Sequence, residues 1–434
     1  MTTSPAYAPT QWVNGKAPDL TDTNLNHLED GVARAHARVD GLQGSAAGVA
    51  APSGQVLFDN FAGTTTDDKV KSLNAWLHTQ QNNNGPMPAV RFACASYSIG
   101  PTPIDFVSGM VLVGGRDAVA HEYSRGTVLK WTGAAGTSLF VFPATQPNQG
   151  YPTDGSPRDV SLRFIQFEGG GSTHCFPKND PDGAYAGKVI WMSNFHGCAW
   201  KNFATVWWGW GDGVTIDGVT HIQGVTDTAF YLAGSENNLF GNGSYSFMDT
   251  TSTTFVQSAS AKPFIRSQMT KSLIGQVMVT ARKWALQLVV EGGQDLIVRG
   301  FAFDAQDSDP VYGSCLRITG GDGIVLDGVN FKGAGSAPGT AVGGAAAHPA
   351  WVYITGGRQI TFVGCQWRRA GSALAADTFP IVAIGPAVAV GQVKWGPSNY
   401  GGWPGDVVVQ QSVAGQLVRC DGNDPAVTVT TVAA

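Results

Sequence analysis

The segment LVVEGGQDLIVRGFAF at residues 288–303 predicts the fold. The same pattern is repeated without gaps as LRITGGDGIVLDGVNF at 316–331 and as VYITGGRQITFVGCQW at 352–367. Each copy contains two short apolar runs that flank a Gly-Gly turn, followed by a run of small and aromatic residues. Alternation of apolar residues with a period of two is typical of β-strands. A period of roughly 20–50 residues indicates stacked repeat units. Weaker copies lie at 159–167, 190–203 and 211–221.

The repeat predicts an all-β solenoid, a parallel β-helix, over residues 56–395. One coil cannot bury its inner face alone, so neighbouring coils stack and their strands pair edge to edge. A sheet of βαβ units is disfavoured because the repeats lack crossover helices. A β-propeller is the alternative, but its blades have more even lengths and antiparallel hairpins. We also predict that Gly320 and Gly356 occupy corners with positive φ and therefore resist β-branched replacement.

Composition excludes several classes of function. The 434 residues include 57 Gly, and 27 Lys and Arg against 32 Asp and Glu give a net charge of -5. A slightly acidic chain has no overall electrostatic attraction to nucleic acid or to an anionic membrane. No apolar run is long enough to span a bilayer, and residues 1–11 lack the pattern of a secretory signal. We therefore expect no nucleic-acid partner and no membrane insertion.

The N-terminal region predicts self-association. Residues 1–20 form an extended arm, because prolines and glycines interrupt any regular pattern. Residues 21–44 predict a helix with apolar positions alternately three and four apart, which is a coiled-coil seam. The seam consists of Leu25, Leu28, Val32, Ala35, Val39 and Leu42. Because a lone helix with so narrow a stripe is marginal in water, we expect it to pack against copies of itself. Docking on the chain's own body is the alternative.

Three further segments flank or cap the solenoid. Residues 45–55 are small and flexible and predict a linker. Residues 67–81 predict an amphipathic helix with Val70, Leu73 and Leu77 on one face, which would cover the open end of the first coil. Residues 396–434 contain alternating runs that predict a C-terminal β segment of closing strands.

Two parts of the chain resemble known families. The segment WVNGKAPDLTDTNLNHLEDGV at 12–32 resembles the N-terminal attachment segment of tail-fibre and minor tail proteins of phages with Gram-positive hosts. The segments at 61–77, 90–99 and 105–115 resemble the opening of pectate-lyase-like right-handed β-helices. The resemblance implies a right-handed β-helix in a phage tail spike. Such spikes are typically homotrimers that bind host-surface polysaccharide, and some cleave it.

Carboxylates that break the repeat are the candidates for catalysis. Asp304, Asp307 and Asp309 crowd onto the insert FDAQDSDP, and Glu291 replaces the threonine of the other two copies. Glycoside hydrolysis needs two carboxylates about 5–5.5 Å or about 6.5–9.5 Å apart, and stacked strands lie about 4.8 Å apart. The acidic insert is catalytic, or holds a cation through its oxygens, or is a solvated loop.

Acids that recur at the same place in two coils are interpreted as structural. Asp212 and Asp217 superpose on Asp322 and Asp327, and aspartate in turns commonly bonds its local backbone. The chain does not match the acid pairs and basic residue of polygalacturonases, nor the calcium site with a catalytic arginine of pectate lyases. Enzymatic activity therefore stays an open alternative.

The densest aromatic patch is TVWWGWGD at 205–212. On a strand, Trp208 and Trp210 share one face and Trp207 points to the other. An exposed indole offers a flat apolar platform with an N–H donor, which suits a sugar ring. The three tryptophans are therefore candidate carbohydrate-binding residues, with a core stack or a trimer interface as the alternative.

The cysteines give no sign of a metal or cofactor site. They are scattered along the chain without the spacing of metal ligands, which favours small buried side chains. They are Cys94, Cys175, Cys198, Cys315, Cys365 and Cys420. We predict no metal and no cofactor.

Together these observations favour a phage tail fibre, tail spike or minor tail protein located in the virion. It would attach to other tail or baseplate proteins through residues 1–42, form a homotrimer, and bind a polysaccharide on the host surface. The alternative function is a polysaccharide depolymerase of the tail-spike type, either a glycoside hydrolase or a lyase.

Overall fold

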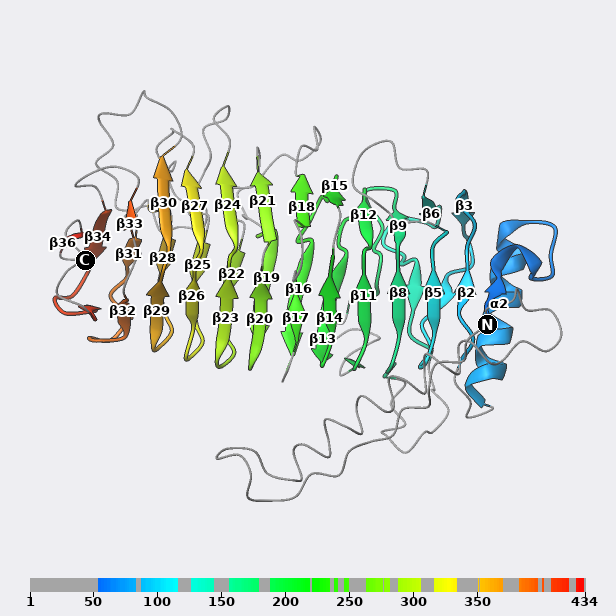
Figure 1. The fold of residues 1–434 in the computed structure, drawn as a ribbon, viewed down its shortest axis with the longest axis horizontal. Coiled ribbons are helices and arrows are strands. Elements are labelled where there is room, and N and C mark those ends of the chain that lie inside the picture. Colours follow the sequence, from blue (N-terminus) through cyan, green and yellow to red (C-terminus); the bar gives the residue numbers. More distant parts are fainter. Residues whose placement is uncertain are drawn as a thin grey trace, which may run out of the picture.

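Three long parallel sheets run along the molecule, and most coils contribute one strand to each of them (Figure 1). The computed structural model describes residues 54–82, 87–115, 126–143, 156–178, 188–218, 221–234, 238–240, 246–249, 263–275, 277–281, 288–305, 316–333, 350, 352–369, 382–396, 400–401, 407–420 and 427–432. Within these ranges the sheets hold 13, 11 and 10 strands and are called sheets 1, 2 and 3. The predicted parallel β-helix is confirmed.

The strands follow one another in the order sheet 3, sheet 1, sheet 2. Sheet 1 consists of β1 (Val56–Leu57), β2 (Val90–Arg91), β5 (Val111–Val113), β8 (Ser161–Arg163), β11 (Asn194–His196), β14 (Thr215–Asp217), β17 (Leu239–Phe240), β20 (Ser272–Gly275), β23 (Leu296–Arg299), β26 (Val325–Asp327), β29 (Ile360–Val363), β32 (Val393–Trp395) and β35 (Leu417–Arg419). Sheet 2 consists of β3 (Ser96–Ile99), β6 (Thr127–Trp131), β9 (Ile165–Glu168), β12 (Ala199–Lys201), β15 (His221–Gln223), β18 (Ser246–Asp249), β21 (Val277–Ala281), β24 (Ala302–Ala305), β27 (Asn330–Gly333), β30 (Gln366–Arg369) and β33 (Tyr400–Gly401).

Sheet 3 carries the surface that matters for the site described below. It consists of β10 (Val189–Trp191), β13 (Trp207–Asp212), β16 (Phe230–Gly234), β19 (Ile265–Met269), β22 (Leu288–Val290), β25 (Leu316–Ile318), β28 (Val352–Ile354), β31 (Val382–Ile384), β34 (Val407–Gln411) and β36 (Val427–Thr431). A short pair, β4 (Ile104–Asp105) and β7 (Phe140–Val141), accompanies the first coils, and a 3-10 turn spans Phe58–Asn60.

The interior of the solenoid is filled by side chains that alternate along each strand. In β23, Leu296 and Val298 are completely buried while Arg299 is exposed. Aromatic rings stack from coil to coil. The ring centres of Phe303 and Phe331 are 5.0 Å apart, those of Phe331 and Trp367 are 4.2 Å apart, and the ring planes lie within 6° of parallel. Because the same position in successive coils carries a flat ring, the core forms a continuous column.

The glycine pairs occupy the corner between sheets 3 and 1. The physical reason that glycine is needed differs between the two members of each pair. The positive φ belongs to the second glycine, with 99° at Gly321 and 97° at Gly357. Gly320 and Gly356 are instead confined by their neighbours, because a Cβ on either would lie 2.3 Å from a backbone oxygen of the preceding coil. The prediction of positive φ at these two first glycines is wrong; close approach of two coils explains them.

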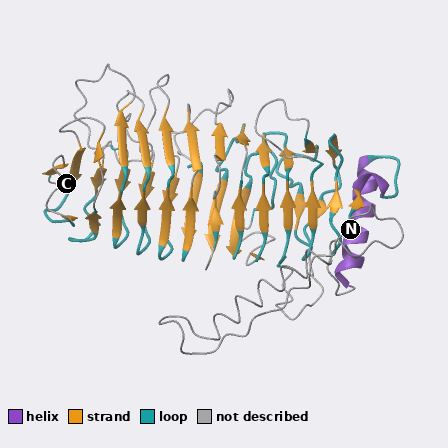
Figure 2. Ribbon diagram, in the orientation of Figure 1, coloured by secondary structure: helices purple, strands orange, loops and turns teal. Residues whose placement is uncertain are grey.

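Helix α2 (Thr66–Asn82) covers the N-terminal end of the column (Figure 2), in place of the predicted 67–81. Its apolar face is formed by Val70, Leu73 and Leu77, all fully buried. The helix packs against β3 and β4 and so shields the edges of these strands from pairing with other chains.

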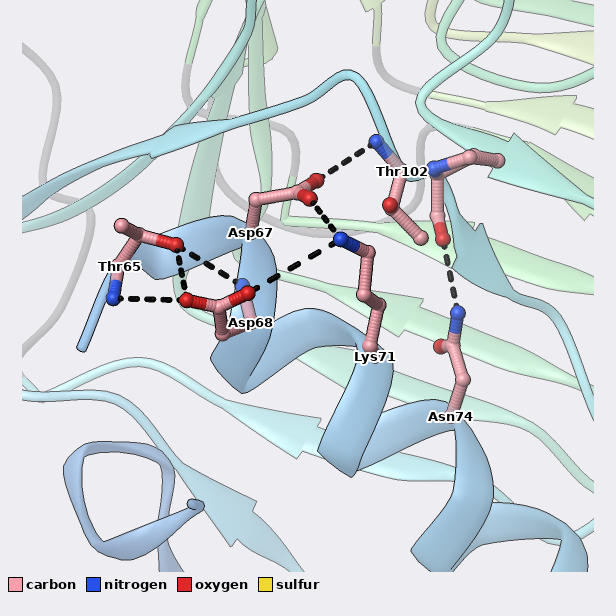
Figure 3. A network of polar contacts seen from close by, with 7 residues as sticks. Thr65, Asp67, Asp68, Lys71, Asn74 and Thr102 are labelled. Atoms are coloured by element: carbon pink, nitrogen blue, oxygen red, sulfur yellow. Dashed lines mark hydrogen bonds and ion pairs between the residues drawn. The ribbon is translucent and has the colours of Figure 1, made fainter. Parts of the chain in front are cut away.

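Polar contacts join α2 to the first coils (Figure 3). The Asp67 carboxylate accepts a hydrogen bond from the Thr102 amide at 2.8 Å and pairs with Lys71 at 2.7 Å. The Lys71 ammonium first, and the Thr102 amide second, lower the pKa of Asp67 below its usual range. Thr65 caps the helix, since its hydroxyl accepts the Asp68 amide at 3.1 Å.

The solenoid extends beyond the boundary expected at residue 395. Strands β33 to β36 continue sheets 1, 2 and 3 in parallel register. The segment at 396–434 therefore adds coils to the same column instead of forming a separate β segment. These strands continue the column because they keep the same alternation. Val409 is buried, just as the inward apolar residues of earlier sheet 3 strands are.

The predicted N-terminal arm at 1–20, the helix at 21–44 with its seam, and residues 45–53 of the linker lie outside the described residues. No helix in the described part of the chain combines the length and apolar character needed to cross a membrane.

Candidate functional site

A row of large polar and aromatic side chains crosses the outer surface of sheet 3. Parallel register places Trp208 of β13 beside Tyr231 of β16, and Tyr231 beside Arg266 of β19. The Trp208 and Tyr231 rings lie 5.1 Å apart with a tilt of 47°. Outward residues of neighbouring strands in register are adjacent on one face, so three residues far apart in sequence form one surface.

Two cations lie against these rings. The Arg266 guanidinium lies 4.8 Å from the Tyr231 ring centre and 5.3 Å from that of Trp208. The Lys178 ammonium lies 4.6 Å from the Trp208 ring centre. Cations at these distances are attracted to the ring faces. Trp208 is therefore held in place by charged neighbours and is not an open platform.

Each cation is also paired with a carboxylate. Arg266 donates from Nε and Nη2 to the two carboxylate oxygens of Glu291, both at 2.9 Å. Gln268 donates to the same carboxylate at 3.3 Å, and Lys178 lies 3.6 Å from Asp227. A bidentate arginine–carboxylate pair holds both planes rigidly. The polar part of this surface is thus fixed before any ligand arrives.

Trp210 is the open aromatic residue of the site. Its side chain is 44% exposed, and it borders a shallow hollow that is also lined by Pro177, Lys188 and Trp208. Its outward row continues to the small Ala233 of β16 and to Gln268 of β19. Ala233 is only 3% exposed, so this position of the row is covered, while Trp210 is 44% exposed.

The structure corrects the role expected for Trp207. This residue is only 3% exposed, and its ring packs against Phe176 and Phe195 at 5.3 and 5.6 Å. Its indole N–H donates to the Gly209 oxygen at 3.3 Å. Strand alternation predicted the opposite orientations of Trp207 and Trp208, and the solenoid interior takes the former. Trp207 is a core residue and not part of a sugar platform.

Of the four acids expected to be catalytic, the described residues include Glu291, which follows a strand of sheet 3, and the backbone of Asp304 in sheet 2. Glu291 follows β22 and is engaged by Arg266 and Gln268. Asp304 lies in β24 of sheet 2, where its backbone pairs with Thr280 and Lys332. Asp307 and Asp309 lie outside the described residues. Glu291 holds the Arg266 guanidinium in place. The catalytic role of Glu291, Asp304, Asp307 and Asp309 stays a prediction.

The repeating aspartates join successive coils. Asp217 bonds His196 of the preceding coil at 2.8 Å, and Asp327 bonds Arg299 of the preceding coil at the same distance. Asp322 pairs at 2.9 Å with an arginine of the following coil. The side chains of these three acids bond partners one coil away and so connect neighbouring coils.

Of the described cysteines, three are buried and two are exposed. Burial raises the pKa of the Cys198 and Cys365 thiols to about 12 and that of Cys175 well above its usual range. Cys94 and Cys420 are exposed single thiols, and Cys315 lies outside the described residues. No group of three His, Cys, Asp or Glu side chains suited to a metal ion occurs in the described ranges.

Sequence reasoning found Trp208 and Trp210 but missed Tyr231, Arg266 and Lys178. The available signal was the pairing of the run FYLAG at 230–234 with WWGWG at 207–211. Inserts of unequal length between the coils conceal this register, and Arg266 follows a further long insert.

Comparisons with solved structures identify the architecture. A mutant tailspike protein of E. coli bacteriophage HK620, solved in complex with a pentasaccharide, matches with a TM-score of 0.53 at 11% identity over 85% of this chain and 67% of that one. DFA-IIIase from Arthrobacter chlorophenolicus A6, without its lid, matches with a TM-score of 0.52 at 11% identity over 87% and 98% of the two chains. ORF18 of Geobacillus virus E2 has a TM-score of 0.43 at 14% identity and covers 88% of this chain.

The chain spans 65% of the Geobacillus virus protein. No family model matches the sequence, and no curated protein matches it. At these identities the likeness concerns the fold alone. The protein is a right-handed parallel β-helix, an architecture that it shares with a phage tailspike.

Proposed function

We propose that this chain is a phage tail fibre, tail spike or minor tail protein that binds a host-surface glycan through the outer face of sheet 3. The observation that carries the proposal is the indole of Trp210, which is 44% exposed beside the fixed row of Trp208, Tyr231 and Arg266. Support comes from the tailspike of the same fold that was solved with a pentasaccharide, and from the resemblance of residues 12–32 to phage tail attachment segments.

The chemistry of this face suits a sugar. The C–H face of a pyranose can stack on the Trp210 indole, which is flat and apolar. Hydroxyl groups find donors and acceptors in neighbouring charged and amide side chains such as Arg266 and Gln268. Because the ion pair between Arg266 and Glu291 is already formed, little side-chain entropy is lost on binding.

The assembly part of the proposal concerns the N-terminal region. Residues 1–42 attach the chain to other tail or baseplate proteins of the virion, and the seam at 21–44 holds three copies together. Three shafts side by side would present three sugar-binding faces, which raises the avidity for a repeating polymer on a cell surface.

The test is glycan binding by the purified full chain, screened on an array of bacterial-type oligosaccharides and then measured by calorimetry. Changing Trp210→Ala removes the platform and should weaken binding about thirtyfold, the loss of a buried aromatic contact of about 2 kcal/mol. The matched control is Val418→Ala, since Val418 is an apolar residue that is 43% exposed on β35 of sheet 1. It should leave affinity unchanged.

Three outcomes would contradict the proposal in different ways. Binding that survives Trp210→Ala would place the glycan elsewhere on the shaft. Absence of any glycan binding would remove the proposed function itself. Shortening of the glycan during incubation, followed by chromatography of the products, would replace a binding protein with a depolymerase.

A further inference from the structure

A shallow groove of about 560 Å³ lies at the corner where the chain turns from sheet 3 to sheet 1. Two parallel rows line it. One row is Gly293, Gly321 and Gly357, which have positive φ of 92°, 99° and 97°. The other row is Gln294, Asp322 and Arg358, which pair as consecutive parallel bridges. The two rows therefore cross three successive coils along the axis of the solenoid, and Thr270 of the preceding coil also lines the groove.

The glycine row forms one side of the groove, and its positions have no room for side chains. A Cβ on Gly293 would lie 2.1 Å from the Met269 carbonyl oxygen, and one on Gly321 would lie 3.0 Å from the Ile324 side chain. Side chains are thus excluded from this row by the approach of the coils as well as by backbone conformation. The backbone forms a flat floor next to a raised row of polar side chains.

The raised row offers both hydrogen-bond donors and acceptors. Arg358 Nη2 lies 2.9 Å from Asp322 Oδ2, and the arginine side chain is 70% exposed. A guanidinium has five N–H donors and a carboxylate has two acceptor oxygens, so one contact between them leaves groups that can face a ligand. Gln294 adds an amide with both functions. Such mixed donors and acceptors complement hydroxyl groups.

Two of the cations beside this path are each paired with a carboxylate. Arg358 is paired with Asp322 in the groove. Arg266 is paired with Glu291, which directly precedes the first Gly-Gly turn of the groove in the sequence. The outward row of Trp210 reaches Gln268, whose amide touches Glu291 at 3.3 Å. A polyanion would find no uncompensated cation in these pairs, and desolvating its charges would be costly. An uncharged ligand avoids that cost.

We propose that the corner groove binds a neutral, polyhydroxylated chain, namely an uncharged oligosaccharide segment, lying along the solenoid axis. The inference rests on the proposed function, because the same glycan would continue from the Trp210 platform. From β13 to β28 there are five coil steps, or about 24 Å at the usual strand spacing. A glycan that contacts both the Trp210 platform and the corner groove must therefore be several sugar units long.

The experiment uses the full chain and a panel of neutral and acidic oligosaccharides from two to ten units long. Arg358→Ala removes donors from the groove and should weaken binding of a bound neutral oligosaccharide about tenfold. Arg299→Ala is the matched control, because Arg299 forms the same kind of exposed pair with Asp327, at 2.8 Å, on sheet 1 outside the groove. It should change affinity by less than about twofold. Thermal unfolding checks that both variants are folded.

Salt dependence gives an independent readout. Affinity for a neutral glycan should stay nearly constant between about 50 mM and about 500 mM sodium chloride, whereas affinity for a polyanion would fall steeply. A preference for acidic glycans would refute binding of a neutral glycan in the groove. So would wild-type affinity in Arg358→Ala together with loss of binding in Trp210→Ala. Either result would leave the proposed function standing. If the wild-type chain retains no glycan, both fail.

Discussion

A methyl group at Gly356 should damage the column, while the same change at the equivalent Gly292 should be tolerated. Both are the first glycine of a Gly-Gly turn, and sequence alone makes them interchangeable. A Cβ on Gly356 would lie 2.3 Å from the Thr319 carbonyl oxygen and 3.0 Å from its carbon. A Cβ on Gly292 would meet only the flexible Gln268 side chain, at 3.8 Å.

The magnitude follows from the spacing of the coils. Carbon and oxygen normally approach to about 3.3 Å, so Gly356→Ala must push the two coils apart by about 1 Å. The Thr355 amide donates to the Ile318 oxygen at 2.8 Å, and that bond would be stretched beyond its usual limit of about 3.2 Å. Overpacking and one weakened backbone bond together cost about 2–4 kcal/mol. Gly292→Ala should change stability by less than about 0.5 kcal/mol.

Hydrogen exchange measured by mass spectrometry provides the assay, because opening of a solenoid is local. In Gly356→Ala, peptides from residues 316–321 and 352–357 should exchange about 100-fold faster, which corresponds to about 3 kcal/mol. The same peptides in Gly292→Ala should match the wild type. Equal protection in Gly356→Ala and wild type, or equal damage in both variants, would refute the reasoning from coil contact.

Three further predictions concern helix α2, the predicted coiled-coil seam and the interior of the column. Asp67 has a lowered pKa in the folded chain because of Lys71 and the Thr102 amide, so its stabilising effect is present above the unfolded value of about 3.9 and is lost as the pH falls through the folded value. Wild-type stability should therefore fall more steeply below about pH 4 than that of Asp67→Asn in thermal scans, and parallel curves would exclude the effect. Leu28→Lys places a charge on the predicted coiled-coil seam and should convert trimers to monomers or aggregates by light scattering; an unchanged trimer would remove the seam. Asn238 is 6% exposed and its amide bridges two neighbouring turns, so Asn238→Ala should cost about 2–3 kcal/mol in denaturant unfolding, whereas an unchanged midpoint would mean that other groups take over these bonds.

Local patterns predicted much of the architecture. Alternation around the Gly-Gly turns predicted parallel stacking, and the apolar face of residues 67–81 predicted the helix that covers the first coil. Alternation also predicted that Trp207 and Trp208 point to opposite sides, although not which side is the interior. These features depend on residues within a few positions of one another.

Local sequence patterns were enough to predict the repeating strands, the position of the Gly-Gly corners and the helix, because each depends on neighbouring residues along the chain. Tertiary structure alone decided which coils face each other. It placed Arg266 between two aromatic rings and Glu291, confined Gly356 but not Gly292, and aligned three polar side chains beside a glycine floor. The physical reason is that strand register between coils depends on inserts of different lengths, whose sequences do not show where the next strand will pair.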